Sequence, residues 1–330
     1  MMKIAIVGAT GLVGREILKV LEEFNFQYDE IYFAASEQSI GKNIEFRNQN
    51  HTIKSIGEVI RLKPHIAIFS AGSSVSLEYA PKFKEIGCYV IDNSSAWRMQ
   101  EDVPLVVPEI NLDTIHQNSY IIANPNCSTI QLVMVLYPIY HRYGLNRMVV
   151  STYQAVTGTG KKAVEQLMGE RSNDPKAPKV YPYPIDLNCI PQCDIFLEND
   201  YTKEEMKIVN ETRKILGNPH LRITATAVRV PVIGGHSESV NLELSKSFSV
   251  SDIKEILYQT PGVVVLDNPS DKEYPMPILV HGKNEVFVGR IRRDESINNG
   301  LNLWIVADNL RKGAATNAVQ IAMRIQEMFF

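Results

Sequence analysis

The stretch that decides the fold is Lys3–Phe24, KIAIVGATGLVGREILKVLEEF, near the start of the chain. An apolar run ends at Gly8, glycines recur at positions 11 and 14, and Arg15–Phe24 has the apolar periodicity of an amphipathic helix. Glycines between a strand and a helix permit a tight turn and let backbone N–H groups approach a pyrophosphate. The G-x-x-G-x-x-G spacing is a variant of the usual one, and a plain tight turn is the alternative. We expect dinucleotide binding by five residues of this turn: Gly8, Thr10, Gly11, Leu12 and Val13.

Outward from this stretch, the first 125 residues continue to alternate apolar runs with helical patterns. The runs lie at 31–35, 66–70, 89–91, 105–107 and 120–123. Strands that alternate with helices predict a Rossmann-like, doubly wound parallel sheet. The turn Asn124-Pro125-Asn126 interrupts the pattern, and a helical stretch follows over 128–140.

From residue 148 onward the strands become longer and richer in β-branched residues. They lie at 148–155, 223–230, 239–244, 263–266, 285–292 and 301–306, and two helices are predicted among them, at 203–216 and 251–258. We therefore expect a second, α+β domain with a large mixed or antiparallel sheet. A final helix at 313–328 could pack on the first domain. The predicted domains are 1–126 plus 310–330, which binds the dinucleotide, and 127–309, which carries catalysis and dimerisation.

The composition narrows the class of protein. The 330 residues include 34 basic and 37 acidic side chains, so the formal net charge is 34 − 37 = −3. A nucleic-acid-binding protein would show a basic excess or stripe, and none is visible. No apolar run approaches the ~20 residues that span a bilayer, and the N-terminus has no signal-peptide pattern. Four cysteines form neither a disulfide framework nor a paired zinc motif, so we expect a cytoplasmic protein without a metal.

Cys127 is the most informative single residue. It follows a predicted strand and an Asn-Pro-Asn turn, and it begins a helix, whose dipole favours a thiolate. A buried structural cysteine is the alternative reading, and it suits Cys88, Cys189 and Cys193 better. On position alone, Cys127 is as well explained as a nucleophile as it is as a structural thiol.

A cysteine nucleophile needs a partner that handles protons, usually a histidine. Six of the seven histidines have no special context, whereas His236 lies in a glycine-flanked turn between two strong strands. Arg229 sits seven residues earlier in an apolar strand, where a lone guanidinium would be costly unless it met an anion. A ligand carboxylate fits, and an internal Asp or Glu is the alternative. Arg98 is a second candidate anion binder that on its own would be read as a surface arginine.

Taken together, these segments resemble the bacterial aspartate-β-semialdehyde dehydrogenase family nearly from end to end. The resemblance is carried by GATGLVG at 8–14, FSAGSSVS at 69–76, VPLVVPEIN at 103–111, NPNCSTIQ at 124–131, STYQAVTGTG at 151–160, NDYTKEEMK at 199–207, RVPVIGGHSESV at 229–240, VFVGRIRRD at 286–294 and DNLRKGAATNAVQIA at 308–322. It implies an architecture like that of glyceraldehyde-3-phosphate dehydrogenase. The implied reaction is the reversible, phosphate-dependent oxidation of L-aspartate-4-semialdehyde to 4-phospho-L-aspartate with NADP(H). In the cell it would run reductively, toward lysine through diaminopimelate and toward threonine, methionine and isoleucine.

The resemblance also implies roles for individual residues. Cys127 is the nucleophile, His236 the acid/base and Gln154 the group that orients the reacting atoms. The substrate is held by Arg229 at its α-carboxylate and by Glu204 at its amino group. Three residues form the phosphate site: Arg98, Asn126 and Lys207. Further cofactor contacts are implied at Gly72, Thr157, Gly158 and Asn309.

Cofactor preference is the one place where the chain departs from the family. An acidic residue after the second strand favours NAD and an arginine favours NADP, and the segment 34–39, AASEQS, contains no arginine. Gln38 stands where many members carry that arginine. The 2′-phosphate could be held by Ser36, Ser39 or Lys42, so NADP is expected with weaker discrimination against NAD.

Two competing hypotheses stay open on the sequence. One is a related acyl-phosphate reductase acting on another substrate, which Glu204 disfavours because an acylated amine would lose the charge to be paired. The other is an inactive paralogue that serves as a binding protein, which the intact Cys127 and His236 disfavour. The expected partners are the small-molecule substrate and inorganic phosphate. The resemblance further implies a homodimer, with a homotetramer as a possible larger assembly.

Overall fold

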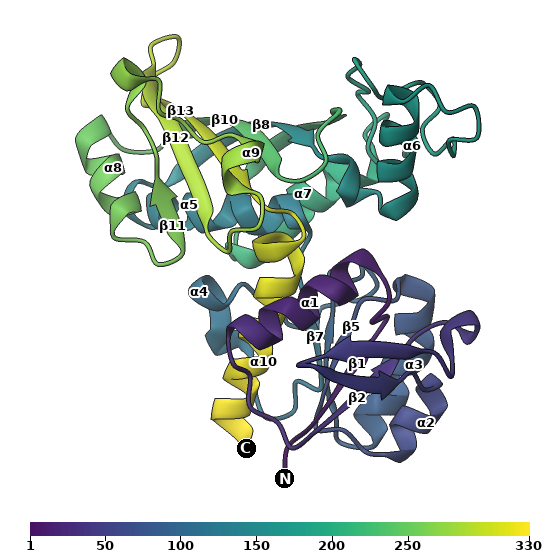
Figure 1. The fold of residues 1–330 in the computed structure, drawn as a ribbon. Helices are drawn as coiled ribbons and strands as arrows, with labels where there is room; N and C mark the ends of the chain where they lie inside the picture. The colour runs from purple at the N-terminus through teal and green to yellow at the C-terminus, as the bar shows by residue number, and fades with distance from the viewer. The chain divides into compact units, whose positions relative to one another are not determined.

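The computed structural model describes all 330 residues, which divide into two compact units. The first unit comprises Met1–Asn126 and Ala314–Phe330, and the second comprises Cys127–Gly313. The chain thus leaves the first unit immediately before Cys127 and returns to it after Gly313, four residues later than the domain boundary expected at 309/310. Figure 1 shows both units with the two termini in the first.

The first unit is built on a five-stranded parallel sheet in the order β2-β1-β5-β6-β7. Its strands are β1 (Lys3–Val7), β2 (Glu30–Ala34), β5 (Ile66–Phe69), β6 (Tyr89–Asp92) and β7 (Ile121–Ala123). After β1 the chain adds β2 on one side and then crosses to β5 on the other. In such sheets, ligands bind outside the carboxyl ends of the strands where the order reverses.

Helices cover both faces of this sheet (Figure 1). They are α1 (Leu12–Glu23), α2 (Ile56–Arg61), α3 (Ser73–Glu85), α4 (Pro108–Asn111) and α10 (Thr316–Phe329). The C-terminal helix α10 packs beside α1, and its Ile321 and Ile325 share one buried core with Ile17 and Leu21 of α1. A small hairpin of β3 (Asn43–Phe46) and β4 (Gln49–Thr52) completes the unit.

One predicted strand of the first unit is wrong. Residues 105–107 make only an isolated bridge, from Leu105 to Ala123, before α4 begins at Pro108. The side chain of Asn111 accepts from the N–H of Val107 at 2.9 Å and donates to the carbonyl of Leu105 at 2.8 Å. The N–H of Val107 and the carbonyl of Leu105 are therefore not available for pairing with a neighbouring strand.

The second unit contains a six-stranded mixed sheet in the order β11-β12-β13-β10-β8-β9. Its strands are β8 (Leu145–Gln154), β9 (Arg222–Arg229), β10 (His236–Leu244), β11 (Val263–Val265), β12 (Val286–Asp294) and β13 (Gly300–Ala307). The central pairs are antiparallel, and the outer pairs β8–β9 and β11–β12 are parallel. The predicted fold class is confirmed: a parallel sheet in the first unit and a large mixed sheet in the second.

Three helices accompany this sheet: α5 (Cys127–Tyr143), α7 (Lys203–Ile215) and α8 (Val250–Tyr258). The long, mostly buried α5 contacts β10, β12 and β13. On the other face of the sheet the alternate residues Tyr153, Ser239 and Trp304 remain partly or fully exposed. A short helix, α9 (Pro277–Val280), precedes β12.

The expectation of only two helices among these strands missed α6 (Lys161–Arg171). Five of its eleven residues are charged, so its apolar side is narrow and its helical pattern is weak in the sequence. It buries Ala163 and Leu167 against Val156, Ile185 and Ile190, a small core separate from the main sheet. No helix of the chain combines the length and the apolar character needed to cross a bilayer.

Candidate active site

Cys127 is the first residue of the 17-residue helix α5 and is partly buried. The dipole of a long helix favours a negative thiolate at its N-terminus. The chain also passes close by at Gly313, where an added Cβ would lie 2.8 Å from the Cβ of Cys127. The backbone can approach the thiol-bearing residue this closely only because position 313 has no side chain.

The imidazole of His236, at the start of β10, is completely buried. Its Nδ1 accepts a hydrogen bond of 3.1 Å from the backbone N–H of Ala155, while Nε2 has no partner. Burial and then the positive charge of Arg229 lower the pKa of His236 to about 3, so the imidazole is neutral at physiological pH. Because Nδ1 accepts, the proton of the neutral ring is on Nε2, which is therefore the nitrogen available to donate.

Arg229 ends β9 and is buried beside this imidazole. Its Nη1 donates to the carbonyl of Ala155 at 2.6 Å, its Nε has no hydrogen-bond partner, and no Asp or Glu forms an ion pair with it. Gly158 lies against both groups, since a Cβ there would be 2.9 Å from Nη1 of Arg229 and 3.0 Å from Nε2 of His236. A buried cation without a counter-ion is the feature that a ligand carboxylate would satisfy.

Gln154, at the end of β8, connects this group to the start of α5. Its Nε2 lies within 3.2–3.3 Å of three acceptors, the Oγ of Ser128, the Oγ1 of Thr152 and the Oε1 of Glu204. The residue after Gln154 holds His236, and Ser128 follows Cys127. The end of β8 therefore ties the predicted nucleophile, imidazole and amino-group ligand into one network.

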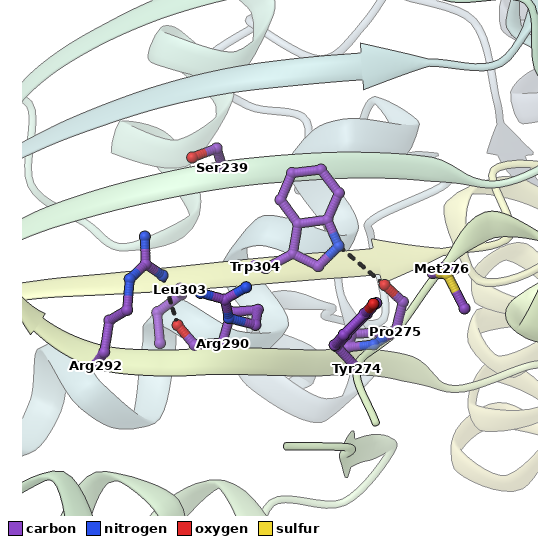
Figure 2. Close-up of a pocket in the computed structure, with 8 residues that line it drawn as sticks. All are labelled: Ser239, Tyr274, Pro275, Met276, Arg290, Arg292, Leu303 and Trp304. Atoms are coloured by element: carbon purple, nitrogen blue, oxygen red, sulfur yellow. Dashed lines mark hydrogen bonds between the residues drawn. The ribbon is translucent and has the colours of Figure 1, made fainter. Parts of the chain in front are cut away.

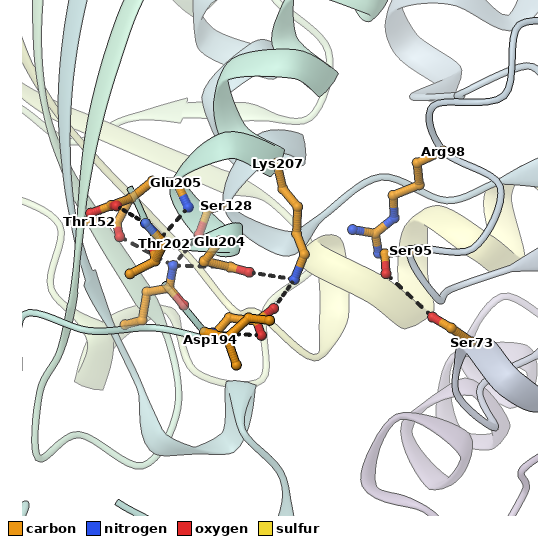
Figure 3. A network of polar contacts seen from close by, with 12 residues as sticks. Ser73, Ser95, Arg98, Ser128, Thr152, Asp194, Thr202, Glu204, Glu205 and Lys207 are labelled. Atoms are coloured by element: carbon orange, nitrogen blue, oxygen red, sulfur yellow. Dashed lines mark hydrogen bonds and ion pairs between the residues drawn. The ribbon is translucent and has the colours of Figure 1, made fainter. Parts of the chain in front are cut away.

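Glu204 and Lys207 lie one turn apart near the start of α7, as the sequence predicts. Their charged groups are 3.0 Å apart, and Lys207 makes a second ion pair of 2.8 Å with Asp194 (Figure 3). Burial alone would lower the pKa of Lys207, but the two carboxylates raise it. Asp194 was missed in the sequence, because it is thirteen residues from Lys207 in a loop without a motif.

The neighbouring Glu205 fixes the start of α7. Its carboxylate completes a capping box with Thr202, and its Oε1 also accepts from the backbone N–H of Ala227 at 2.9 Å. Ala227 lies two residues before Arg229 on β9. One carboxylate thereby joins the helix that carries Glu204 to the strand that carries Arg229.

Thr157 and Asn309 have structural roles close to His236. The Oδ1 of Asn309 accepts from the N–H of Gly235 at 3.1 Å, and its Nδ2 donates to the Oγ1 of Thr157 at 3.1 Å. Both residues thus support the glycine turn that precedes His236. A cofactor contact by Thr157 or Asn309 stays a prediction.

In the first unit, the glycine turn has the shape that the sequence predicts. Gly8 has φ of +89°, and a Cβ on it would lie 2.6 Å from the carbonyl oxygen of Ser70, while one on Gly14 would lie 2.2 Å from that of Gly8. Gly11 caps α1 without any side-chain bond to the helix start. Gly8 and Gly14 therefore let the backbone of the turn pack closely, while the N-terminus of α1 at Gly11 is exposed. A helix start of this kind fits the phosphates of a dinucleotide.

The other predicted cofactor residues of this unit lie after neighbouring strands. Ser36, Gln38 and Ser39 follow β2 in or beside a short 3-10 helix, and Gly72, with φ of +87°, caps α3 after β5. The N–H of Gly8 donates to the carbonyl of Ala34 at 2.8 Å, so the end of β2 lies beside the glycine turn. Gln38 is exposed and uncharged, so it offers no cation to a phosphate bound at this edge of the sheet.

Arg98 and Asn126 are both buried in the first unit. Arg98 donates from Nε to the carbonyl of Asn124 at 2.9 Å and from Nη2 to that of Asn93 at 2.8 Å. Asn124 in turn accepts from Asn317 at 2.6 Å. The two hydrogen bonds to backbone carbonyls orient the guanidinium of Arg98.

In the whole chain, no group of three or more His, Cys, Asp or Glu side chains could hold a metal ion.

A parallel sheet with a glycine turn, together with a helix-start cysteine, a buried imidazole and a buried arginine without a counter-ion, is the combination expected of a dehydrogenase that uses a cysteine. Comparison with known families agrees. Residues 3–118 match the model "Semialdehyde dehydrogenase, NAD binding domain", and residues 136–312 match "Semialdehyde dehydrogenase, dimerisation domain".

The relatives narrow this class further. An aspartate-semialdehyde dehydrogenase of Aquifex aeolicus is 54% identical over 97% of this chain and 96% of its own length, and one of Bacillus subtilis is 48% identical over 98% and 97%. The crystal structure of aspartate semialdehyde dehydrogenase II from Vibrio cholerae in complex with ASA superposes with a TM-score of 0.96 at 43% identity, covering 100% of this chain and 99% of that one. The chain belongs to the aspartate-semialdehyde dehydrogenase family.

Proposed function

We propose that the chain catalyses the reversible, NADP-dependent reductive dephosphorylation of 4-phospho-L-aspartate to L-aspartate-4-semialdehyde. Curated relatives with this enzyme's name cover nearly the whole chain, and one related structure holds the substrate ASA. The observation that carries the residue-level proposal is the buried guanidinium of Arg229, without a counter-ion, beside the neutral imidazole of His236. The reaction serves the biosynthesis of lysine, threonine, methionine and isoleucine.

Cys127 begins the reductive reaction. Its thiolate attacks the carbonyl carbon of the acyl phosphate, the bond from that carbon to the phosphate oxygen breaks, and inorganic phosphate leaves. The product on the enzyme is a thioester. The N-terminus of α5 favours the thiolate at the start and receives it again when the aldehyde is released.

His236 supplies the proton chemistry. When bound, the nicotinamide supplies the hydride that reduces the thioester carbon. The Nε2–H of the neutral imidazole then donates to the oxygen that gains negative charge, and Nε2 takes the proton back as the carbon–sulfur bond breaks. The bond from Ala155 to Nδ1 holds the ring in the tautomer that this sequence requires.

The substrate is held at both of its charged ends. The guanidinium of Arg229 is free to pair with the α-carboxylate, and Glu204 accepts from the α-ammonium, with Gln154 bonded to Glu204. Lys207, Arg98 and Asn126 make up the proposed phosphate site. In this structure Lys207 is paired with two carboxylates, so phosphate would compete with Asp194 for the same ammonium.

NADP is the proposed cofactor. Support comes from the turn around Gly8 and Gly14, from the matched NAD-binding domain, and from a Candida albicans aspartate semialdehyde dehydrogenase solved with NADP, which has a TM-score of 0.78 at 25% identity over 99% of this chain and 98% of its own. Ser36, Ser39 and Lys42 are the candidates for the 2′-phosphate. With Gln38 in place of an arginine, we expect NAD to be used as well.

We place the subunit contact of a homodimer on the face of the mixed sheet opposite α5. A pocket of about 280 Å³ on this unit is lined by Ser239, Arg290, Arg292 and Trp304 (Figure 2). The ring centroids of Tyr153 and Trp304 are 5.5 Å apart. Aromatic and arginine side chains are enriched in the cores of protein interfaces. The matched dimerisation domain covers all of them. Tyr153→Asp should yield monomers in analytical ultracentrifugation, and an unchanged dimer would exclude this face.

An assay of the purified protein tests the reaction. L-aspartate-4-semialdehyde and phosphate should reduce NADP⁺, no reduction should occur without phosphate, and Cys127→Ala should abolish turnover. Absence of turnover in the wild type would refute the proposed function. Substantial turnover in Cys127→Ala would refute the nucleophile, with Cys189→Ala as the exposed-thiol control. Cytoplasmic location belongs to the same proposal and is tested by cell fractionation.

A further inference from the structure

Glu238 is a carboxylic acid buried in the core of the second unit, and no step of the reaction uses it. It lies two residues after His236 on β10, so both side chains point to the same face of the sheet. Neither residue has any exposed surface. The register partners of Glu238 are Thr152 on β8 and Ile305 on β13, and Gln131 of α5 faces it across the core.

None of these neighbours carries a positive charge that could balance a carboxylate. Neither oxygen of Glu238 has a hydrogen-bond partner in the structure. Burial raises the pKa of Glu238 well above its usual value, and the nearby Gln131 offsets only part of that effect. Complete burial without a neighbouring cation favours the protonated form of this side chain, which has an O–H group to donate.

Gln131 needs a donor of this kind. Its Nε2 donates to the backbone carbonyl of His236 at 3.3 Å, whereas its Oε1 is buried and has no partner. A carboxylate at Glu238 would repel this oxygen, but a protonated acid can bond to it. Glu238 and Gln131 are thus neighbouring buried side chains, and both the carboxyl group of Glu238 and the Oε1 of Gln131 lack a hydrogen-bond partner.

The position of Gln131 gives this pair a link to the chemistry. Gln131 lies four residues after Cys127 on α5, one turn further along the same side of the helix. Its bond to the carbonyl of His236 connects the helix of the nucleophile to the strand of the imidazole. On the other side, Thr152 accepts from Gln154, which is bonded to Ser128 beside Cys127.

We propose that Glu238 is a positioning residue that acts as a neutral acid, donating its proton to Oε1 of Gln131 and so holding Gln131 on the backbone of His236. The imidazole is thereby kept at a fixed distance from the helix start that carries Cys127. Reactions of this kind depend on ångström-level placement of the catalytic groups. The kinetic part of the inference rests on the proposed function, and the protonation state of Glu238 does not.

The first test compares Glu238→Gln with Glu238→Leu. Gln keeps a donor of the same length without an ionisable proton, so it should retain most of the wild-type kcat, whereas Leu should lower kcat by about tenfold with KM little changed. The matched control is Glu243→Leu, further along the same strand and only half-buried, which should leave kcat unchanged. Thermal unfolding of each variant identifies any effect that comes from misfolding alone.

The second test is a double-mutant cycle with Gln131→Leu. If Glu238 acts through Gln131, each single Leu variant should lose about the same activity, and the double variant should lose no more than either. Additive losses would overturn the proposal. So would a Glu238→Leu variant with wild-type kcat, or a Glu238→Gln variant as impaired as Glu238→Leu.

A spectroscopic measurement is independent of turnover. Infrared difference spectra of the wild type against Glu238→Gln should show the carbonyl stretch of one protonated carboxylic acid at neutral pH. Its absence would overturn the neutral-acid assignment even if the enzyme is active. Its presence in a chain that does not turn over aspartate semialdehyde would leave the protonation state established and the proposed function refuted.

Discussion

The backbone N–H of Ala155 donates to Nδ1 of His236, and the carbonyl of the same residue accepts from Arg229. A single main-chain position thus orients both the proposed proton donor and the proposed substrate cation. Neither side chain relies on another charged group for its placement. Ala155 directly follows the last residue of β8, so the two groups are held beside the end of a strand, where placement is accurate enough for catalysis.

Gly158→Ala should inactivate the enzyme without unfolding it. The new Cβ would lie 2.9 Å from Nη1 of Arg229 and 3.0 Å from Nε2 of His236, so both side chains must move. We expect kcat/KM to fall by about 100-fold, because displacements near 1 Å have costs of that size. Gly57→Ala is the control: an added Cβ meets nothing there, and its melting temperature should rise. A fully active Gly158→Ala variant would contradict the site.

Arg229→Lys should raise the KM for aspartate semialdehyde far more than it lowers kcat. Lysine keeps the charge but loses the planar, two-pronged geometry that pairs with a carboxylate. The loss of one charge-assisted hydrogen bond predicts an increase in KM of about 10- to 100-fold. Arg222→Lys, exposed at the other end of β9, should behave like the wild type. Equal KM values in both variants would contradict the proposal that Arg229 binds the substrate carboxylate.

His236 should make the folded state less stable in acid. Its pKa is lowered to about 3 in the folded protein against an ordinary value of 6.5, so the unfolded chain binds the extra proton between these values. The contribution of the neutral His236 to the free energy of unfolding is complete above pH 6.5. It is lost as the pH falls toward 3, at up to about 1.4 kcal/mol per pH unit. The free energy of unfolding, measured with urea between pH 4.5 and 7.5, should depend less steeply on pH in His236→Gln than in the wild type. Identical slopes would contradict a neutral, buried imidazole.

Asp194→Asn should strengthen phosphate binding specifically, because the carboxylate of Asp194 competes with phosphate for the ammonium of Lys207. Asp194 forms a 2.8 Å ion pair with Lys207, and that interaction lowers the pKa of Asp194 despite its partial burial. Without the carboxylate, Lys207 is paired with Glu204 alone, so we expect the KM for phosphate to fall by about tenfold and that for the semialdehyde to change little. Asp200→Asn in the same loop, exposed, is the control. Parallel changes in both KM values would place Asp194 elsewhere in the reaction.

Gln38→Arg should strengthen the preference for NADP. An arginine after β2 would supply the planar cation suited to a 2′-phosphate, and the exposed position accepts a longer side chain. We expect kcat/KM for NADP⁺ to rise by about tenfold with no gain for NAD⁺. Gln117→Arg, at the opposite end of the sheet before β7, adds the same charge as a control. A similar gain from both substitutions would show a general charge effect.

The fold was largely predictable because its elements have clear periodicity. The strand, glycine turn and helix of residues 3–24 lie almost where the pattern places them, and the six strands of the second unit were all anticipated. The errors have local causes. Residues 105–107 look like a strand but have their backbone groups engaged by Asn111, and the charged helix α6 has too narrow an apolar side to be recognised.

The site was predictable only as far as each residue has a context of its own. Cys127 and His236 stand out by their turns, and Arg229 by its apolar strand. Asp194 and Glu238 do not, because their roles depend on neighbours far away in the sequence. The pairing of Lys207 with Asp194, and the burial of Glu238 opposite Gln131, exist only once the chain has folded.

The carboxylate of Glu205 has a consequence for chirality. It binds the start of α7 and the backbone of β9 at once, so Glu204 and Arg229 cannot move apart independently. Under the proposed assignments, an α-amino acid is grasped at its ammonium, its carboxylate and its reacting carbon, which are three points on a rigid frame. A mirror-image substrate can match only two of them. The enzyme should therefore reject D-aspartate-4-semialdehyde, and a buried side chain that touches no ligand would be what makes it selective.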